Sequence, residues 1–310
     1  MSSISNYSID NHGQKKNEKG RLFYHFIALL IVIIWGTTLV NTKILLQYGM
    51  REDEIFFARM IIAYLSILFI SPRKLWADNW RDELWMMLLG ITGGSLYFIS
   101  ENYALQYTMA NNVSFIISAS PLFTALITLT FTKGMKLEKT LLIGTLLAIV
   151  GVGIVIFGGQ VGGLKVNPIG DFLAIVSSFC FGLYCFLLMK CGNKYSPVFI
   201  TRKVFAYGML TTVPLFIFMP WQFDLSRIFE PGVLFNLLFL GLIASFACFA
   251  LWSVVTKKLG AVVAANYNYI SPIATILTSW LFLNERMTIL SWIGCALILL
   301  GVIIANKNNA

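Results

Sequence analysis

Long apolar stretches alternate with short polar connections along almost the whole chain of 310 residues. Ten stretches are about 20 residues long, enough for an α-helix to cross the roughly 30 Å hydrocarbon core of a membrane. Spanning strands are excluded because no alternating pattern is present and lipid cannot satisfy their backbone groups. The pattern therefore predicts ten transmembrane helices over residues 22–46, 54–71, 83–104, 109–131, 138–158, 170–189, 197–219, 233–255, 261–282 and 287–305.

The apolar pattern repeats when the chain is shifted by 151 positions. Ala110–Pro121 then falls on Ala261–Pro272, and Gly90 falls on Gly241. The two stretches share a Ser-Pro pair in the same register, which apolar composition alone would not easily produce. An internal repeat of half the chain indicates a duplication. We expect an all-α membrane protein with five-helix repeats at 21–158 and 168–306, preceded by a disordered cytoplasmic tail at 1–20.

Lys and Arg are distributed unevenly between the two ends of the predicted helices. Fifteen fall on the side of the N-terminus, and five fall on the other side: Lys43, Arg51, Lys165, Arg227 and Arg286. Because cytoplasmic connections carry the excess of basic residues, the sequence predicts cytoplasmic N- and C-termini in a multi-pass inner-membrane protein. Five helices per repeat is an odd number, so the repeats must be inserted in opposite directions. In transporters, such inverted repeats place the substrate site near the membrane midplane.

Composition agrees with a membrane protein and excludes several other classes. Only 12% of the residues are charged and 58% are hydrophobic, whereas a soluble domain carries about 25% charged residues. The net charge of +9 does not indicate a nucleic-acid partner, because the basic residues form short clusters between apolar runs. No phosphate-binding loop, hydrolase motif or metal-ligand spacing is present, so we expect no enzyme activity, no cofactor and no metal. The five cysteines are expected to be buried free thiols.

A pair of glycines spaced by seven residues occurs in the last helix of each repeat. Gly144 and Gly151 recur as Gly294 and Gly301. Residues seven apart share one helix face, so each pair predicts a surface on which a neighbouring helix packs closely. We interpret these helices as scaffold and not as part of a site.

The order of these motifs resembles that of the drug/metabolite transporter superfamily, specifically its ten-helix EamA type. The resemblance spans residues 22–305 and is carried by Trp35-Gly36-Thr37, the arginine that closes EIFFAR, the two Ser-Pro pairs and the ending Phe282–Ala305. It implies paired five-helix repeats around a central cavity and the export or uptake of small metabolites, often amino acids or drugs. Glu285 and Arg286 have no counterpart in the first half, so a role for Glu285 would not be shared by symmetry.

Glu101 is the main candidate for a substrate-binding or coupling residue. A charged side chain inside a spanning helix costs a few kcal/mol, so each one suggests a function. Gly94, Tyr97 and Glu101 share one helix face at spacings of three and four. Glu101 is interpreted as a proton acceptor or as the partner of a cationic group on the substrate. The alternative is that it reaches interfacial water near the outer end of its helix.

Further polar and aromatic residues are weaker candidates for the cavity lining. Lys43 either reaches the lipid headgroups or pairs with Glu101. Asn111, Ser118 and Pro121 belong to a polar stripe that either contacts neighbouring helices or lines the cavity. Asn266 and Tyr269 share one face of the ninth predicted helix, Asn268 and Pro272 share another, and the sequence does not show which face meets the cavity. The remaining candidates for the lining are Trp35, Asn41 and Trp252.

Four residues are candidates for gates or hinges. Arg59 and Arg202 close matching motifs in the second helix of each repeat and are expected towards opposite membrane faces. Pro121 and Pro272 each free a backbone carbonyl one turn earlier and soften the helix. Symmetric soft points suit a rocking motion, although a static kink is equally compatible.

The sequence therefore predicts a secondary transporter, most simply an exporter, for small organic metabolites such as amino acids or drugs. Its partners would be the substrate, the lipid bilayer and, under one hypothesis, protons. The alternatives are an integral-membrane enzyme acting on lipid or isoprenoid substrates, and a passive channel. An enzyme would need a cluster of acidic, histidine or metal-ligating residues at one membrane face, and a channel would need a continuous polar pore. Substrate identity, transport direction, coupling ion and oligomeric state do not follow from the sequence.

Overall fold

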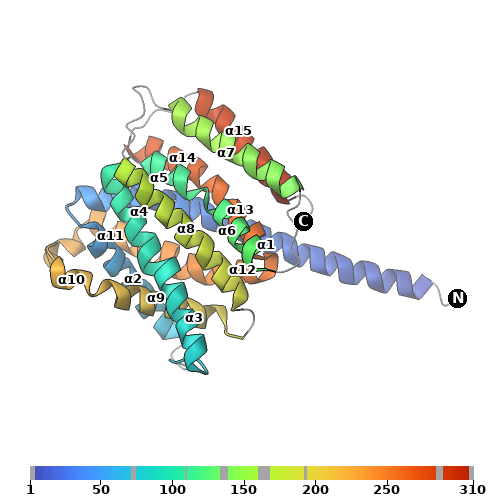
Figure 1. Ribbon diagram of the computed structural model, residues 1–310, viewed down its shortest axis with the longest axis horizontal. Helices are drawn as coiled ribbons and strands as arrows, with labels where there is room; N and C mark the ends of the chain where they lie inside the picture. The colour runs from blue at the N-terminus through green and yellow to red at the C-terminus, as the bar shows by residue number, and fades with distance from the viewer. Residues whose placement is uncertain are drawn as a thin grey trace.

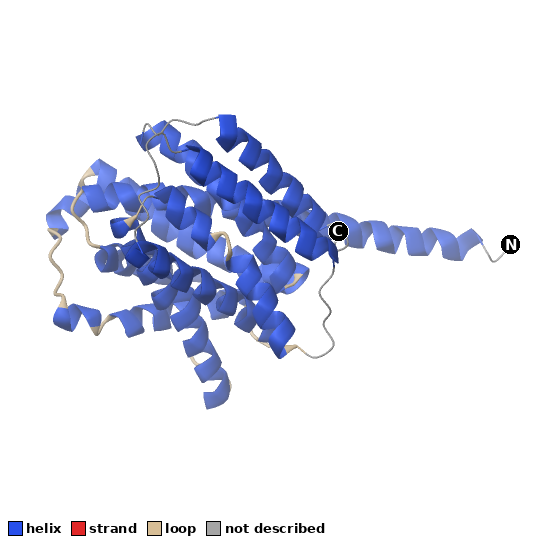
Figure 2. Cartoon of the chain, turned by 45° about the horizontal axis from the view of Figure 1, so that its top comes forward, coloured by secondary structure: helices blue, strands red, loops and turns tan. Residues whose placement is uncertain are grey.

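The computed structural model describes residues 4–70, 75–108, 110–132, 139–159, 168–191, 194–283 and 289–306. Every regular element within these ranges is a helix, and no strand occurs in them (Figure 2). The first half contains α1 (Ile4–Gln47), α2 (Glu52–Ile70), α3 (Trp80–Gly90), η1 (Ile91–Ser95), α4 (Leu96–Tyr107), α5 (Ala110–Ile117), α6 (Ser120–Phe131) and α7 (Lys139–Gly159).

The second half begins with α8 (Pro168–Lys190) and α9 (Pro197–Thr212), followed by the short elements α10 (Leu215–Phe218) and η2 (Leu225–Phe229). It continues with α11 (Pro231–Leu238), η3 (Phe239–Ala247), α12 (Cys248–Leu259), α13 (Ala261–Asn266), η4 (Tyr267–Ile270), α14 (Ser271–Leu283) and α15 (Ile289–Asn306). Most of these helices form one bundle, as Figure 1 shows.

Four helical stretches are long and apolar enough to cross a membrane, over Arg21–Gln47, Trp80–Tyr107, Pro168–Lys190 and Pro231–Leu259. Large apolar side chains also point outward from the bundle, for example Phe69 with 88% of its surface exposed. Such exposure is unfavourable in water and is expected where lipid is the solvent. The chain is therefore a helical membrane protein, and the total of ten spans stays a prediction.

The N-terminal segment differs from the disordered tail that the sequence predicts. Helix α1 begins at Ile4, and its first part projects away from the bundle (Figure 1). The physical reason is that adding a residue to an existing helix costs much less than starting one, so a long membrane helix can continue into a polar segment.

Two local features recur in both halves of the chain. The third helix of each half contains a π-helical segment, η1 in the first half and η3 in the second. Gly90 and Gly241, which are 151 positions apart, lie just before or within these segments. Gly90 approaches the backbone of Val204 in α9, and Gly241 approaches the backbone of Arg59 in α2. Each half therefore packs its glycine against the second helix of the other half.

The fourth helix of each half is broken, whereas the sequence predicts continuous spans at 109–131 and 261–282. A turn separates α5 from α6, and the 3₁₀ segment η4 separates α13 from α14. Pro121 and Pro272 are the second residues of α6 and α14. In the first turn, a proline removes a backbone N–H that would have no helical partner in any case. The prolines thus begin new helices, which is a larger interruption than the predicted kink.

The predicted glycine surface is confirmed between α7 and α15, which lie side by side (Figure 1). A Cβ atom on Gly144 would lie 2.5 Å from the carbonyl oxygen of Gly301. A Cβ atom on Gly151 would lie 2.8 Å from the carbonyl oxygen of Gly294. Only glycine permits such close contact between the two backbones.

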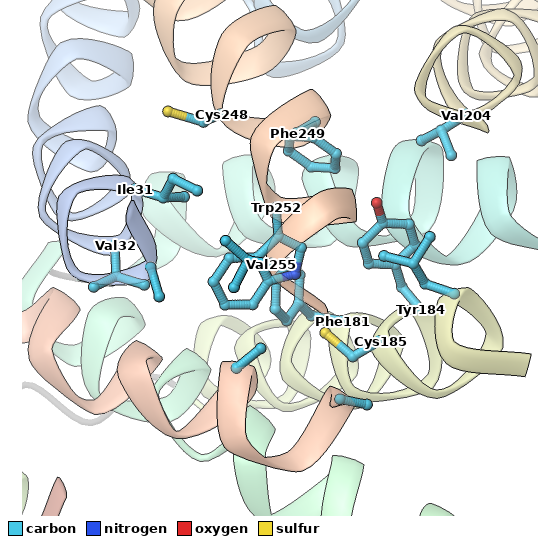
Figure 3. Packing of buried hydrophobic residues seen from close by; sticks show 14 of the residues in the cluster. Ile31, Val32, Phe181, Tyr184, Cys185, Val204, Cys248, Phe249, Trp252 and Val255 are labelled. Atoms are coloured by element: carbon cyan, nitrogen blue, oxygen red, sulfur yellow. The ribbon is translucent and has the colours of Figure 1, made fainter. Parts of the chain in front are cut away.

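Aromatic residues form the centre of the core. Phe181 and Tyr184 of α8 pack around Phe249 and Trp252 of α12, as Figure 3 shows. Trp252 is completely buried, and its ring centroid lies 6.0 Å from that of Phe181. The predicted free thiols are confirmed for the described cysteines, of which Cys180, Cys185 and Cys248 are buried and Cys191 is half-buried.

Candidate functional site

A cavity lies between the two halves of the chain. The cavity itself is small, with a volume of about 30 Å³. The first half contributes α1, α4, α5 and the turn after α5, and the second half contributes α8, η4 and α14. The lining residues are Trp35, Leu39, Tyr97, Glu101, Ser114, Ile117, Ser118, Phe181, Asn268 and Ser271.

Glu101 lines this cavity and is only 6% exposed. Tyr97, one turn earlier on α4, donates a hydrogen bond from its hydroxyl to Oε1 of Glu101 over 3.1 Å. The buried position differs from the interfacial alternative, in which the carboxylate would reach water at the helix end. Gly94, the third residue of the predicted face, instead approaches the backbone of Gly208 in α9. Its role in the structure is helix packing.

Arg59 of α2 is a buried basic residue that packs against α4, the helix that carries Glu101. It is 1% exposed, and its Nε donates a hydrogen bond to Oγ of Ser245 in η3 over 2.9 Å. Its guanidinium carbon lies 4.3 Å from the centre of the Phe98 ring. Arg59 and Glu101 form no direct ion pair in the described part of the chain. The predicted partner Lys43 is half-buried on α1 and forms no such pair with Glu101 there either.

Aromatic side chains form one wall of the cavity. Trp35 of α1 meets Phe181 of α8 edge to face, with ring centroids 5.6 Å apart. The indole nitrogen of Trp35 donates a hydrogen bond to the carbonyl oxygen of Ala244 in η3 over 2.9 Å, which fixes the ring. Trp252 packs behind Trp35 at a centroid distance of 5.0 Å. Trp252 is therefore a core residue and not part of the lining, because a fully buried indole has no surface left for the cavity.

Hydroxyl and amide groups form the other wall, where the two broken helices meet. The hydroxyl oxygens of Ser114 in α5 and Thr275 in α14 lie 3.1 Å apart. Asn268 of η4 donates a hydrogen bond from Nδ2 to Oγ of Ser120 in α6 over 3.3 Å. These bonds connect the first half to the second across the cavity, so the breaks in both halves are held together by polar contacts.

The structure shows which face of the ninth predicted helix meets the cavity. Asn268 and Ser271 line it, whereas Asn266 and Tyr269 are buried elsewhere, with 1% and 0% exposure. The face of Asn268 is therefore the one that meets the cavity, and the choice between the two faces depends on how η4 and α14 pack against the first half. Phe181 was also missed, since an isolated phenylalanine in an apolar helix gives no signal.

The remaining predicted residues are spread over other parts of the structure. Asn41 donates a hydrogen bond to Oδ1 of Asn236 in α11 over 2.6 Å and is outside the lining. Arg202 of α9 is 2% exposed, with its guanidinium carbon 5.5 Å from the Phe199 ring centre. Ser118 lies in the lining. The side chain of Asn111 and the pair Glu285–Arg286 lie outside the described part of the chain.

Comparison with known proteins identifies the family of this chain. The sequence profile of the EamA-like transporter family matches twice, at residues 22–157 and at residues 168–307. The chain belongs to the EamA-like transporter family. The double match also confirms the duplication that the sequence repeat predicts. As a member of this family with apolar helices, the chain is a multi-pass membrane protein, and the family name indicates a transporter and not an enzyme.

Relatives with curated names agree with this family. An uncharacterized transporter of Archaeoglobus fulgidus is 27% identical over 90% of this chain and 95% of its own length. A probable amino-acid metabolite efflux pump of Escherichia coli is 23% identical over 90% of this chain and 93% of its own. A probable terminal-alkyne amino-acid exporter of Streptantibioticus cattleyicolor is 21% identical over 91% and 92%. The EamA-type chain thus resembles whole transporters and not fragments of them.

A solved crystal structure shares the fold of this EamA-type chain. It has a TM-score of 0.69 at 16% sequence identity and covers 94% of this chain and 97% of its own. At this level of identity the likeness concerns the overall fold.

Proposed function

We propose that this protein is a secondary transporter that exports small organic metabolites, such as amino acids or their derivatives, across the cytoplasmic membrane. The observation that carries the proposal is the buried cavity between the two halves, which combines one carboxylate, aromatic rings and hydroxyl groups. Binding sites for small molecules are concave, largely apolar and equipped with a few polar groups that orient the ligand. Two relatives whose names refer to amino-acid export support this substrate class.

The proposed mechanism is alternating access between two inverted five-helix repeats, with both termini in the cytoplasm. Its support is a reciprocal contact between the first helix of each half and the broken helix of the other. Gly36 of α1 packs against Ser271, Ala274 and Thr275 of α14, while Gly182 of α8 packs against Ser120, Phe123 and Thr124 of α6. The two sets of contacted residues are related by the same shift of 151 positions. Reciprocal contacts of this kind favour a pseudo-twofold axis through the cavity.

The proposed coupling residue is Glu101. Charged groups on the helices that contact α4 include Arg59 of α2, Lys43 of α1 and Asp171 of α8, and Arg59 lies over the Phe98 ring of α4. A carboxylate that is almost completely buried, as Glu101 is, is costly when ionised and unpaired. It can therefore exchange a proton for a cationic group of the cargo, which would couple export to the proton gradient.

The test measures exchange of labelled amino acids and amines in proteoliposomes, with and without a pH gradient. Native protein should exchange one solute class and should use the gradient to accumulate it. Glu101→Gln should abolish accumulation driven by the gradient. The matched control is Glu230→Gln, because Glu230 lies before α11 and forms an exposed pair with Arg227. This control should behave as the native protein does.

Two outcomes would contradict the proposal. Absence of exchange for every solute tested would remove the assignment as a transporter of this class. Accumulation by Glu101→Gln at the native level would leave transport intact and remove Glu101 from coupling.

A further inference from the structure

The π-helical segment η3 of the second half receives hydrogen bonds from two helices of the first half. Trp35 of α1 donates to the carbonyl oxygen of Ala244 over 2.9 Å, and Arg59 of α2 donates to Oγ of Ser245 over 2.9 Å. The two acceptors are consecutive residues. Trp35 lines the cavity, and Arg59 lies over the Phe98 ring of α4, the helix that carries the cavity carboxylate Glu101. Isolated π-helical turns inside α-helices are frequent at functional sites, and here the turn connects the cavity wall to a buried charge.

Arg59 holds its charge near Glu101 without binding it directly. Its guanidinium is anchored by Ser245 and lies over the Phe98 ring. Its Nη1 atom is buried and has no hydrogen-bond partner in the described part of the chain. In a complete buried ion pair, every N–H donor of the cation has a hydrogen-bond acceptor. Arg59 therefore keeps one donor without a partner, and Glu101 has no ion-pair partner in the described part of the chain.

The surroundings of Glu101 suit a positively charged group. Tyr97 and Phe181 lie in ring contact, with centroids 5.3 Å apart, and Trp35 continues this wall. Aromatic faces attract ammonium groups, and the attraction is larger when water is excluded. The opposite wall carries hydroxyl and amide groups and contains no charged residue among those that line the cavity. The cavity thus has one charged end and one neutral polar end.

We propose that the cargo binds Glu101 through a positively charged amine, and that Arg59 is the internal counter-charge that occupies this electrostatic role while the cavity is empty. The inference rests on the proposed function and specifies its substrate class. When an amine neutralises Glu101, the attraction that holds Arg59 towards α4 weakens. Because Arg59 is bonded to Ser245, this change reaches η3 of the second half. A change in the occupancy of the cavity would then move Arg59 and, through its bond to Ser245, affect the second repeat.

The experiment measures binding to purified protein by isothermal titration calorimetry with triplets of ligands that share one side chain and differ in charge. Each triplet consists of the amide, the free amino acid and the N-acetyl derivative of leucine, phenylalanine or tryptophan, so that net charge changes from positive through zwitterionic to negative. Native protein should bind the amide of at least one triplet more tightly than its N-acetyl form. Arg59→Gln should bind that amide more tightly than native protein does, by a factor on the order of ten, since one nearby positive charge has been removed.

Three variants separate a charge effect from a general loss of structure. Arg59→Lys keeps the charge and should retain the native preference between amide and N-acetyl forms. Ser245→Ala removes the anchor and should change the same preference without changing any charge. Arg202→Gln is the matched control, because Arg202 is a similarly buried arginine in the second helix of the other half. It should leave the preference unchanged.

The proposal is overturned if none of the amides binds better than its N-acetyl form. It is also overturned if Arg59→Gln changes the affinity of all three members of a triplet equally, or if Arg202→Gln has the same effect as Arg59→Gln. Because binding is measured without transport, these outcomes are distinct from a failure of the proposed function. A protein that binds amides selectively but exchanges no solute would retain this inference and lose the transport assignment.

Discussion

Glu101 and Trp252 occupy equivalent positions in the two halves, 151 residues apart. Glu101 lines the cavity and bonds Tyr97, while Trp252 is completely buried in the aromatic core. By contrast, Gly90 and Gly241, and likewise the Ser-Pro pairs, are the same in both halves. The duplication is therefore preserved at these glycine and Ser-Pro positions and is lost at the position of the cavity carboxylate.

The largest effect is expected when a carboxylate is introduced at position 252, the equivalent of Glu101 in the second half. Trp252→Glu would put a charge into the core, at a cost of about 3 kcal/mol or more. We expect little protein to be recovered as a single species after detergent extraction. Trp252→Phe is the control, because it keeps the site apolar and should be recovered nearly as well as native protein. Equal recovery of both variants would mean that the position tolerates charge, and the contrast with Glu101 would then be wrong.

The second effect tests whether the reciprocal glycine contacts are equivalent. A Cβ atom on Gly36 would lie 2.5 Å from the carbonyl oxygen of Ser271, and one on Gly182 would lie 2.9 Å from the backbone nitrogen of Thr124. Gly36→Ala and Gly182→Ala should each lower the stability by about 1–3 kcal/mol, the usual cost of overpacking. Thermal unfolding in detergent measures this. A loss at only one of the two glycines would argue against the pseudo-twofold arrangement.

A smaller effect is expected when the polar contact between the broken helices is removed. Asn268 corresponds to Ile117 of the first half, and both line the cavity. Asn268→Ile makes the two positions alike and removes the bond to Ser120. We expect a loss of about 0.6 kcal/mol, typical of hydrogen bonds between membrane helices. Unchanged stability would show that packing, and not this bond, holds the two breaks together.

The last comparison concerns the turns that connect the first two helices of each half, and it includes the smallest expected effect. Arg51 donates to Asp53 over 2.6 Å and also to the carbonyl oxygens of Met219 and Pro220. Lys194 bonds Asp82 but is about half-exposed. Arg51→Met should therefore destabilise the protein by about 1 kcal/mol, whereas Lys194→Met should have a barely measurable effect because water screens the pair.

The pH dependence of the Lys194 variant provides a check on this difference. The hydrogen bond to Asp82 raises the pKa of the Lys194 ammonium above its ordinary value. A raised pKa means that the stabilisation is complete below the ordinary pKa of lysine and is lost as the pH rises through the raised value. Native protein and Lys194→Met should thus converge in melting temperature at strongly alkaline pH. A difference that grows with pH would contradict this assignment.

The sequence by itself determined the helical membrane class, the duplication and the glycine contacts between α7 and α15. These features depend on residue type and spacing, namely long apolar runs, a repeat with a period of 151 residues and glycines seven apart. The family match confirms the two repeats. The sequence also singled out Glu101, because a carboxylate in an apolar helix is costly and therefore conspicuous.

Only the tertiary structure decided which residues share the cavity with Glu101. It brought Trp35 and Ser118 to the lining, left Trp252, Asn41, Asn266 and Tyr269 outside, chose the face of Asn268 over that of Asn266, and added Phe181 and Ser271. It also showed that Arg59 packs against α4 and that Lys43 forms no ion pair with Glu101 in the described part of the chain. The physical reason is that the lining combines residues from both halves, and contacts between the halves depend on packing over more than a hundred intervening residues.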